Sequence, residues 1–401
     1  MAARRMKGAW WVDFRYEGQR FRKKSPVDNK RGAEEYERKL RQQLLDGTYQ
    51  REEVPTFREW FNGRFWTEWV IGRKNKPSEA ESKRSIFKHH LEPAFGGRRL
   101  DQIGNGEVAA FRARMVQEGR LSDKRINNIL AVLSKALRYA VEVEVLGQAP
   151  RVGLFKVEAH DIVFWEFDEY ARLLQAAAQE GVTWYVAVCL AGEAGMRIGE
   201  VRGLRWLDVD SDGKTITVSQ QIWHGIEGTP KGRTRRVVPM TPVLSEALQR
   251  LGGLQQGYVL QNPDGSPLSD GQTIHAIFRI CDRAGLGEEQ YPKRSWHVLR
   301  HTFGTHAALF GANPWRLQAW LGHKRIDETQ RYVHVAEAHQ RQWPLAVVEA
   351  ARQEQDLDRR VIAMLGARSI ARPGTADAQT IWSGHPVGTD ESGKPLGTEN
   401  H

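Results

Sequence analysis

The segment 297–332 holds the side chains that most narrow the chemistry of this 401-residue chain. A phosphodiester undergoing substitution gathers negative charge on its non-bridging oxygens, so a site without a metal needs fixed guanidinium and imidazole donors around it. Arg300 offers such a donor, and His297 and His323 offer two more. Tyr332 offers a hydroxyl that can act as a nucleophile. This combination of residue types and spacing suits phosphoryl transfer.

A zinc site is the competing interpretation, because His297 and His301 stand four residues apart, a spacing that places two ligands on one helix face. It is the weaker one. No glutamate follows His297, and the fixed charge of Arg300 opposes a nearby dication. The two cysteines, Cys189 and Cys281, form no CxxC motif. We therefore predict no metal and no cofactor. Two cysteines are also too few for a disulfide framework, which fits a reducing cytoplasm.

Two upstream segments supply further cations. Arg197 follows the apolar segment 185–194, and Glu200 comes about one helical turn later, where a carboxylate can orient a guanidinium that grips two phosphate oxygens. A structural Arg–Glu pair between two helices is the open alternative. Lys231 precedes a strand expected at 235–240 and stands at the tip of a β-hairpin. From there it can reach a leaving oxygen, although an ordinary loop lysine fits the same position.

Length and charge set the outer bounds. A chain of 401 residues suggests two or three domains. Its 59 Lys plus Arg exceed its 49 Asp plus Glu, giving a net charge of +10 and favouring a polyanionic partner, of which nucleic acid is the most common. The first residues lack the apolar stretch of a signal peptide, and no run of about 18 apolar residues could cross a membrane. We expect no membrane association and a cytoplasmic protein.

Residues 1–50 form the first of four expected regions. Alternating residues at 10–16, a Glu17-Gly18 turn and a basic strand at 19–24 predict a β-hairpin. Residues 1–24 carry eight basic and two acidic side chains. Such a hairpin could lie in a DNA groove, or it could be solvated and pack its aromatic residues on the helix that follows.

Residues 55–150 have the pattern of a helical bundle. Thr56 with Glu59, and Ser78 with Glu81, have capping-box spacing and predict two helix starts. The region holds 17 basic and 11 acidic residues, enough for several phosphate contacts. One amphipathic helix is expected from apolar residues at helical spacing: Ile126, Leu130, Leu133, Leu137 and Val141.

Residues 162–350 mix helix and strand, with strands expected at 215–218 and 235–240. The stretch 368–401 is rich in Gly, Pro, Thr and Asp and is expected to be a disordered tail. The predicted fold class is therefore mainly α with small β-sheets, in a chain of several domains.

Four motifs together resemble the tyrosine recombinases of the phage and genomic-island integrase type. They are AGMRIGEVRGLRW at 194–206, TPKGRTRRVVPM at 229–240, WHVLRHTFGTH at 296–306 and LGHKRIDETQRYVH at 321–334. The resemblance covers about 162–345 closely. It implies that 55–150 is a helical, SAM-like core-type DNA-binding domain. More loosely, by composition, 1–50 resembles the arm-type DNA-binding region of the family.

The resemblance also implies a role for each site residue. Tyr332 would attack phosphorus and form a 3′-phosphotyrosine, and His297 would assist removal of its proton. Lys231 would protonate the 5′ leaving oxygen, and neither ATP nor a metal ion would be required. The scissile phosphate would be bound by the three remaining residues: Arg197, Arg300 and His323.

The partners implied are two double-stranded DNA sites held by a homotetramer, with possible accessory DNA-bending or directionality proteins. The expected function is integration or excision of a phage or other mobile element. A chromosome-dimer resolvase and a type IB topoisomerase-like enzyme share this chemistry, but the extra basic N-terminal region argues against both. A non-catalytic DNA-binding regulator is disfavoured, because the chain retains the whole set of catalytic residues.

Overall fold

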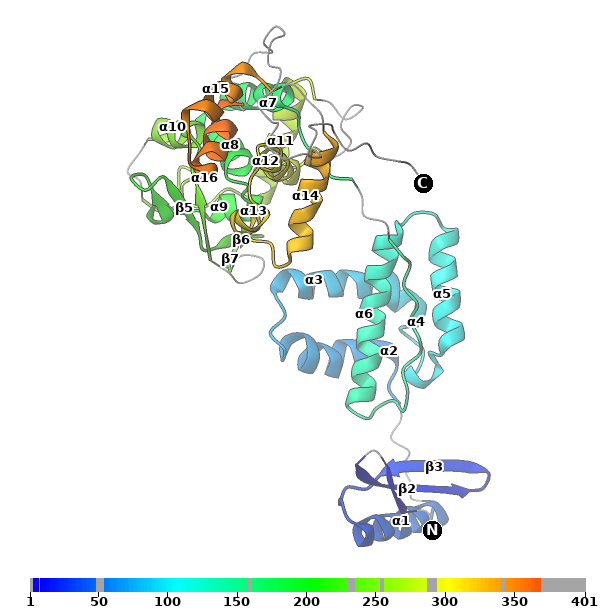
Figure 1. Ribbon diagram of the computed structural model, residues 1–401. Coiled ribbons are helices and arrows are strands. Elements are labelled where there is room, and N and C mark those ends of the chain that lie inside the picture. The colour runs from blue at the N-terminus through cyan, green and yellow to red at the C-terminus, as the bar shows by residue number, and fades with distance from the viewer. Residues whose placement is uncertain are drawn as a thin grey trace, which may run out of the picture. The chain divides into compact units, whose positions relative to one another are not determined.

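Figure 1 shows a computed structural model of the chain. Most of the described residues are helical and the sheets are small, so the predicted fold class is correct. The chain divides into two compact units, residues 1–158 and 159–401. The structure describes residues 3–6, 8–47, 54–157, 161–229, 235–252, 256–286, 294–339 and 343–368.

The chain begins with a three-stranded antiparallel sheet in the order β1 (Ala3–Met6), β2 (Ala9–Tyr16) and β3 (Gln19–Lys24). Glu17 and Gly18 both have positive φ, at 46° and 77°, as a tight two-residue hairpin turn requires. The predicted hairpin is therefore confirmed, while β1 was not foreseen. Helix α1 (Lys30–Leu45) covers one face of the sheet.

The next segment is a helical bundle, as predicted. Thr56 caps α2 (Phe57–Trp60) through a complete capping box with Glu59. A helix also starts near Ser78, but the capping box predicted there was wrong: the N-cap is Lys76, two residues earlier, and α3 begins at Pro77. Proline has the right φ and needs no partner for its nitrogen at the first helical position. The remaining elements are η1 (Phe61–Ile71), α3 (Pro77–Ile86), η2 (Phe87–Leu91), α4 (Glu92–Phe95), η3 (Leu100–Gln102), α5 (Asn105–Gln117) and α6 (Asp123–Glu142).

Helix α6 carries the predicted apolar stripe into the core of the bundle. Ile126, Leu130, Leu133 and Leu137 are almost completely buried. They pack with the aromatic side chains of α2, η1 and η2, among which the rings of Phe61 and Phe87 stack at 4.1 Å between centroids. This burial makes α6 the central helix of the bundle.

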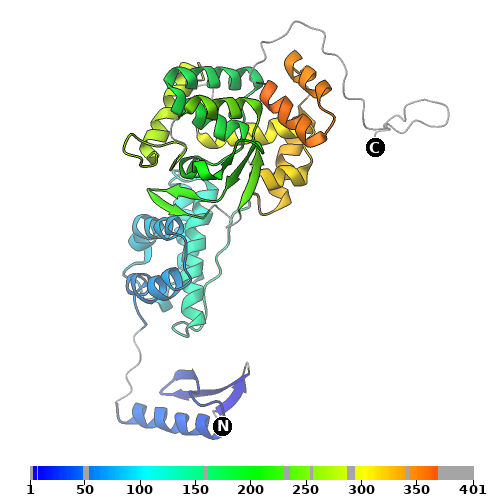
Figure 2. The same cartoon turned by 90° about the vertical axis from the view of Figure 1, so that its left-hand side faces the viewer.

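The second unit is built around α8 (Val182–Glu193), which is buried from Val186 to Glu193. Helices α7 (Phe167–Glu180), α10 (Pro242–Leu251) and α12 (Trp296–Leu309) pack against α8, and Figures 1 and 2 show these helices gathered on one side of the small sheets. Because α8 is apolar on all its faces, other elements must pack around it to bury those side chains. Helix α8 therefore forms the centre of this unit.

The sheets of this unit are short and antiparallel. One has the order β4 (Val209–Asp210), β5 (Thr215–Val218), β8 (Arg236–Pro239), and β6 (Gln221–Trp223) pairs with β7 (Ile226–Gly228). The predicted strands at 215–218 and 235–240 are thus present. The remaining elements are α9 (Ile198–Gly203), η4 (Trp206–Asp208), α11 (Asp270–Arg283), α13 (Pro314–Leu321), α14 (Ile326–Ala338), α15 (Leu345–Gln353) and α16 (Leu357–Ala367).

Helix α16 packs on α10 and α12. Arg368, directly after it, is fully buried, donates to the carbonyl of Gly192 and pairs with Glu193 at 3.2 Å. The folded part of this unit thus continues past residue 350, where the sequence suggested its end. The disordered tail predicted for 368–401 therefore starts too early, because Arg368 is part of the folded core. Residues 369–401 lie outside the described residues. None of the helices in the described part of the chain has the length and apolar character needed to cross a membrane.

Candidate active site

Four elements of the second unit carry the predicted catalytic residues. The charges of Arg197 and Arg300 act on both His323 and Tyr332, so the structure brings these residues together. Lys231 lies outside the described residues. The other five are placed as follows: Arg197 at the N-cap of α9, His297 and Arg300 on α12, His323 directly after Gly322 at the end of α13, and Tyr332 on α14.

Arg300 is held rigidly by backbone carbonyls. Its side chain donates from Nη1 to the carbonyl of Gly195 at 2.6 Å and from Nη2 to that of Leu321. Gly195 has φ +62°, and a Cβ there would lie 2.5 Å from the ring of Phe303, so the turn that offers this carbonyl requires glycine. Burial, reinforced by the charge of Arg197, lowers the pKa of Arg300 to about 9. The guanidinium is thus charged at neutral pH and poorly compensated.

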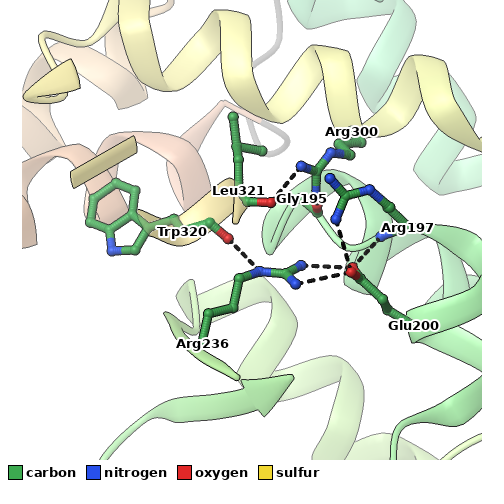
Figure 3. A network of polar contacts seen from close by, with 7 residues as sticks. All are labelled: Gly195, Arg197, Glu200, Arg236, Arg300, Trp320 and Leu321. Carbon is green, nitrogen blue, oxygen red and sulfur yellow. Dashed lines mark hydrogen bonds and ion pairs between the residues drawn. The ribbon is translucent and has the colours of Figure 1, made fainter. Parts of the chain in front are cut away.

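Glu200 binds two arginines at once (Figure 3). Its carboxylate accepts from Arg197 Nη1 at 3.0 Å and from both terminal nitrogens of Arg236, at 2.9 and 2.6 Å. Burial alone would raise the pKa of Glu200, but the hydrogen bonds and charge of Arg236 and the charges of Arg197 and Arg300 hold it at about 2. The predicted contact between Glu200 and Arg197 is therefore present, and the carboxylate is ionised.

Arg236 was not predicted as a residue of the site. It is buried on β8, and its Nε donates to the carbonyl of Trp320 at 2.8 Å. The alternation of inward-facing and outward-facing residues along the strand could have identified it. Arg236 and Val238 face inward while Val237 faces solvent, so an arginine occupies a position where alternation calls for an apolar side chain.

The three arginines outnumber the single carboxylate that joins them. Arg197, Arg236 and Arg300 carry three positive charges, and Glu200 carries one negative charge. Arg197 is the most accessible of the three, with 20% of its side chain exposed. An excess of two fixed positive charges in a largely buried cluster suits an anion such as a phosphodiester.

The hydroxyl of Tyr332 lies 2.8 Å from Nδ1 of His301. Tyr332 is 2% exposed, and its ring packs on Gly304, where a Cβ would approach ring carbons to 2.8 Å. From the sequence, His301 was a candidate only for metal binding. Its i, i+4 spacing from His297 was noted, but only the packing of α12 on α14 shows that this ring meets the tyrosine.

Both partners of this contact are neutral at pH 7. Burial, with further contributions from His297 and Arg300, lowers the pKa of His301 to about 3. Burial raises the pKa of Tyr332, although the charge of Arg300 opposes the rise. With the ring proton on Nε2 of His301, the hydroxyl of Tyr332 donates to Nδ1.

His323 also stacks on the ring of Tyr332, with ring centroids 6.0 Å apart and planes 5° from parallel. Its Nδ1 lies 2.9 Å from Oγ1 of Thr329. Burial, with the charge of Arg300, lowers the pKa of His323 to about 3. If the threonine hydroxyl donates to Nδ1, the ring proton lies on Nε2, which can then donate to an anionic oxygen.

His297 lies next to His301 in a T-shaped arrangement, with ring centroids 4.3 Å apart. It thus belongs to the same cluster, although His301 is the ring that contacts the Tyr332 hydroxyl. Within the described ranges, no group of three or more His, Cys, Asp or Glu residues has the arrangement of a metal site.

Comparison with known proteins agrees with this geometry. Residues 164–339 match the model of the phage integrase family. A tyrosine recombinase XerC-like protein of Caldanaerobacter subterraneus is 24% identical over 67% of this chain and 77% of its own length. The ICEBs1 integrase of Bacillus subtilis is 28% identical over 34% of this chain and 37% of its own length.

Solved structures show the same fold. The Tn1549 transposon integrase in complex with transposon right end DNA has a TM-score of 0.59 at 21% identity, covering 69% of this chain and 97% of that chain. A lambda integrase tetramer bound to a Holliday junction has a TM-score of 0.56 at 19% identity, covering 81% of this chain and 92% of that chain. Residues 164–339 are therefore a phage integrase family domain. The similarity to a tyrosine recombinase extends over two thirds of the chain.

Proposed function

We propose that this protein is a site-specific integrase that cleaves and rejoins DNA through a 3′-phosphotyrosine and thereby integrates or excises a mobile element. The observation that carries the proposal is the Tyr332 hydroxyl, held 2.8 Å from His301 beside a cluster of three arginines and one carboxylate. Such a cluster offers a nucleophile together with the positive charge that the phosphoryl transition state needs.

In the proposed reaction Arg197 and Arg300 bind the scissile phosphate, and His323 donates to a non-bridging oxygen. The oxygen of Tyr332 forms a bond to phosphorus while the bond from phosphorus to the 5′ oxygen breaks. Lys231 gives its proton to that leaving oxygen. Because the phosphotyrosine keeps the energy of the broken bond, a 5′ hydroxyl can reverse the step, so ATP and metal ions are not required.

The proton of Tyr332 passes to His301 in this scheme, with His297 supporting the neighbouring ring. A pKa of about 3 makes His301 a poor base while the site lacks an anion. A phosphodiester bound at the arginines adds a negative charge nearby, which raises the proton affinity of the imidazole. Activation of the buried tyrosine is thereby coupled to the arrival of DNA.

The wider assembly follows from the same proposal. We propose a homotetramer acting on two DNA duplexes, with residues 55–150 as the core-type and 1–50 as the arm-type DNA-binding region. The catalytic region would span 162–350. The Tn1549 and lambda integrase structures, which contain DNA, support a DNA substrate. Two buried free thiols, Cys189 and Cys281, agree with a cytoplasmic protein. Accessory DNA-bending or directionality proteins complete the proposed partners.

Tyr332→Phe tests the chemistry most directly, because it removes one hydroxyl and no charge. A nicked suicide duplex should trap the unaltered protein covalently, whereas the Tyr332→Phe variant should bind the duplex equally well and give no adduct. Tyr258→Phe is the matched control: it removes a partly exposed hydroxyl that contacts Glu227, and the adduct should remain. An adduct formed with phenylalanine at 332 would show that the nucleophile is misassigned.

A further inference from the structure

The N-terminal sheet has one apolar and one basic face. Val12 and Phe14 are buried against Leu40 of α1, so the residues between them point away from the helix. Strand pairing places the side chains of directly opposed residues on the same side. The face away from α1 therefore holds one acid, one tryptophan and five exposed basic residues: Asp13, Trp11, Arg4, Arg15, Arg20, Arg22 and Lys24.

Asp13 lies at the centre of this face, surrounded by arginines. It accepts from Arg20 through two hydrogen bonds, 2.7 Å from Nε and 2.6 Å from Nη2. Arg4 from β1 pairs with the same carboxylate, and Nε of Arg22 lies 3.7 Å away. The side chain of Asp13 is only 4% exposed, whereas the three arginines remain about half exposed. The carboxylate is covered by the arginines that it holds.

This arrangement determines which edge of Arg20 is available. The carboxylate of Asp13 occupies the edge formed by Nε and Nη2, so the edge formed by Nη1 and Nη2 points away from it. That end-on edge is the one that pairs with O6 and N7 of guanine in the major groove. One arginine already neutralises the buried Asp13 carboxylate, so the need to compensate this charge does not account for three arginines around it.

We propose that this face reads guanine in a DNA major groove and that Asp13 is the positioning residue that fixes its arginines. This deepens the proposed function and rests on it. A flat, basic sheet can enter the major groove of B-DNA, which admits a β-ribbon. The deep, narrow major groove of double-stranded RNA does not admit side chains in this way. Lys24 is also paired with Glu144, at 3.6 Å. The remaining excess of positive charge on the face would contact phosphates at the groove edges.

The test uses the full chain with Tyr332→Phe, so that binding is measured without cleavage. Binding to a pool of randomised duplexes should select a guanine-containing sequence that depends on the N-terminal sheet. Arg20→Lys keeps the charge but loses the two-pronged edge, and should reduce the preference for guanine by roughly 5- to 150-fold. Arg5→Lys, on the opposite face of the sheet, is the matched control and should leave the preference unchanged.

Asp13→Asn tests the positioning role separately. It removes the carboxylate charge that holds the arginines, so the preference for guanine should fall about tenfold. Affinity for random duplex DNA should stay equal or rise, because the face gains net positive charge. A merely structural role would instead lower both affinities together. An unchanged preference in Asp13→Asn or Arg20→Lys would overturn the proposal, as would equal binding of duplex RNA or of anionic lipid vesicles.

Failure of this inference is distinguishable from failure of the proposed function. In the protein with Tyr332 present, covalent adduct on a short suicide duplex depends on the second unit and should be unchanged by Arg20→Lys and Asp13→Asn. A normal adduct without a guanine-containing motif would refute the reading of the sheet alone. No adduct with the unaltered protein would refute the recombinase proposal itself.

Discussion

Replacing Glu200 by glutamine should separate the two tasks of the arginine cluster. The carboxylate is fully buried and pairs with both Arg197 and Arg236. Glu200→Gln has nearly the same shape but leaves both guanidiniums without their counter-charge. We therefore expect three effects of different sign: lower stability, lower cleavage, and DNA affinity that is unchanged or higher because the site becomes more positive.

The magnitude follows from the pKa of Glu200. The carboxyl titrates at about 2 in the folded protein, against an ordinary value of 4.5. Since a tenfold change in proton affinity is worth about 1.4 kcal/mol, ionised Glu200 stabilises the fold by about 3 kcal/mol. Because its folded pKa is depressed, this contribution is fully present above pH 4.5 and is lost as the pH falls from 4.5 towards 2.

Chemical unfolding at pH 7 measures the loss, and a difference of about 3 kcal/mol corresponds to a fall of roughly 6 to 12 °C in the melting temperature of a unit of this size. The difference between the two proteins should shrink when the measurement is repeated at pH 3. Glu246→Gln is the control, because its pair with Arg250 is exposed and should change stability by less than about 1 kcal/mol. If Glu200→Gln were as stable as this control, the carboxylate would not be holding the cluster together.

Three further predictions concern the tyrosine, its histidine and the DNA. Gly304→Ala would place a Cβ 2.8 Å from the ring of Tyr332, so formation of the covalent adduct should fall at least about tenfold. Gly106→Ala is the control and should have no effect, because Gly106 has open space around it. Thr329→Val removes the hydroxyl beside His323 and should slow single-turnover cleavage about tenfold with unchanged binding; unchanged cleavage would exclude a role in orienting that ring. Affinity for duplex DNA should fall with salt, with a log–log slope of about −0.9 per phosphate neutralised, and a flat salt dependence would contradict backbone contacts.

The candidate residues of the site were easier to select from the sequence than the contacts that hold them. Tyr332 and Arg300 could be proposed because each lies in a short segment where residue type and spacing point to phosphoryl transfer. The residues that hold them in place could not be predicted, because they come from distant parts of the chain. Arg236 binds Glu200 from 36 residues away and the Trp320 carbonyl from 84 residues away. No local pattern specifies such contacts.

His301 shows a different limit. Its spacing from His297 is visible in the sequence, but the same spacing fits a metal pair, a neutral cluster or a proton acceptor. The choice depends on how deeply α12 is buried and on which ring faces α14. The capping box predicted at Ser78 failed for a related reason, because two local signals competed and the proline at 77 determined the outcome.

The burial of Arg300 links stability to function. A pKa of about 9 means that its charged form is less favourable in the folded protein than in water, so at neutral pH the fold bears the cost of a charged but poorly compensated group. The backbone carbonyls of Gly195 and Leu321 fix its position, yet they bring no full negative charge. An anion bound beside Arg197 and Arg300 would remove much of that cost. The same burial keeps His301 neutral and Tyr332 protonated. In the proposed reaction this electrostatic imbalance would favour phosphate binding and keep the nucleophile inactive until the phosphate is bound.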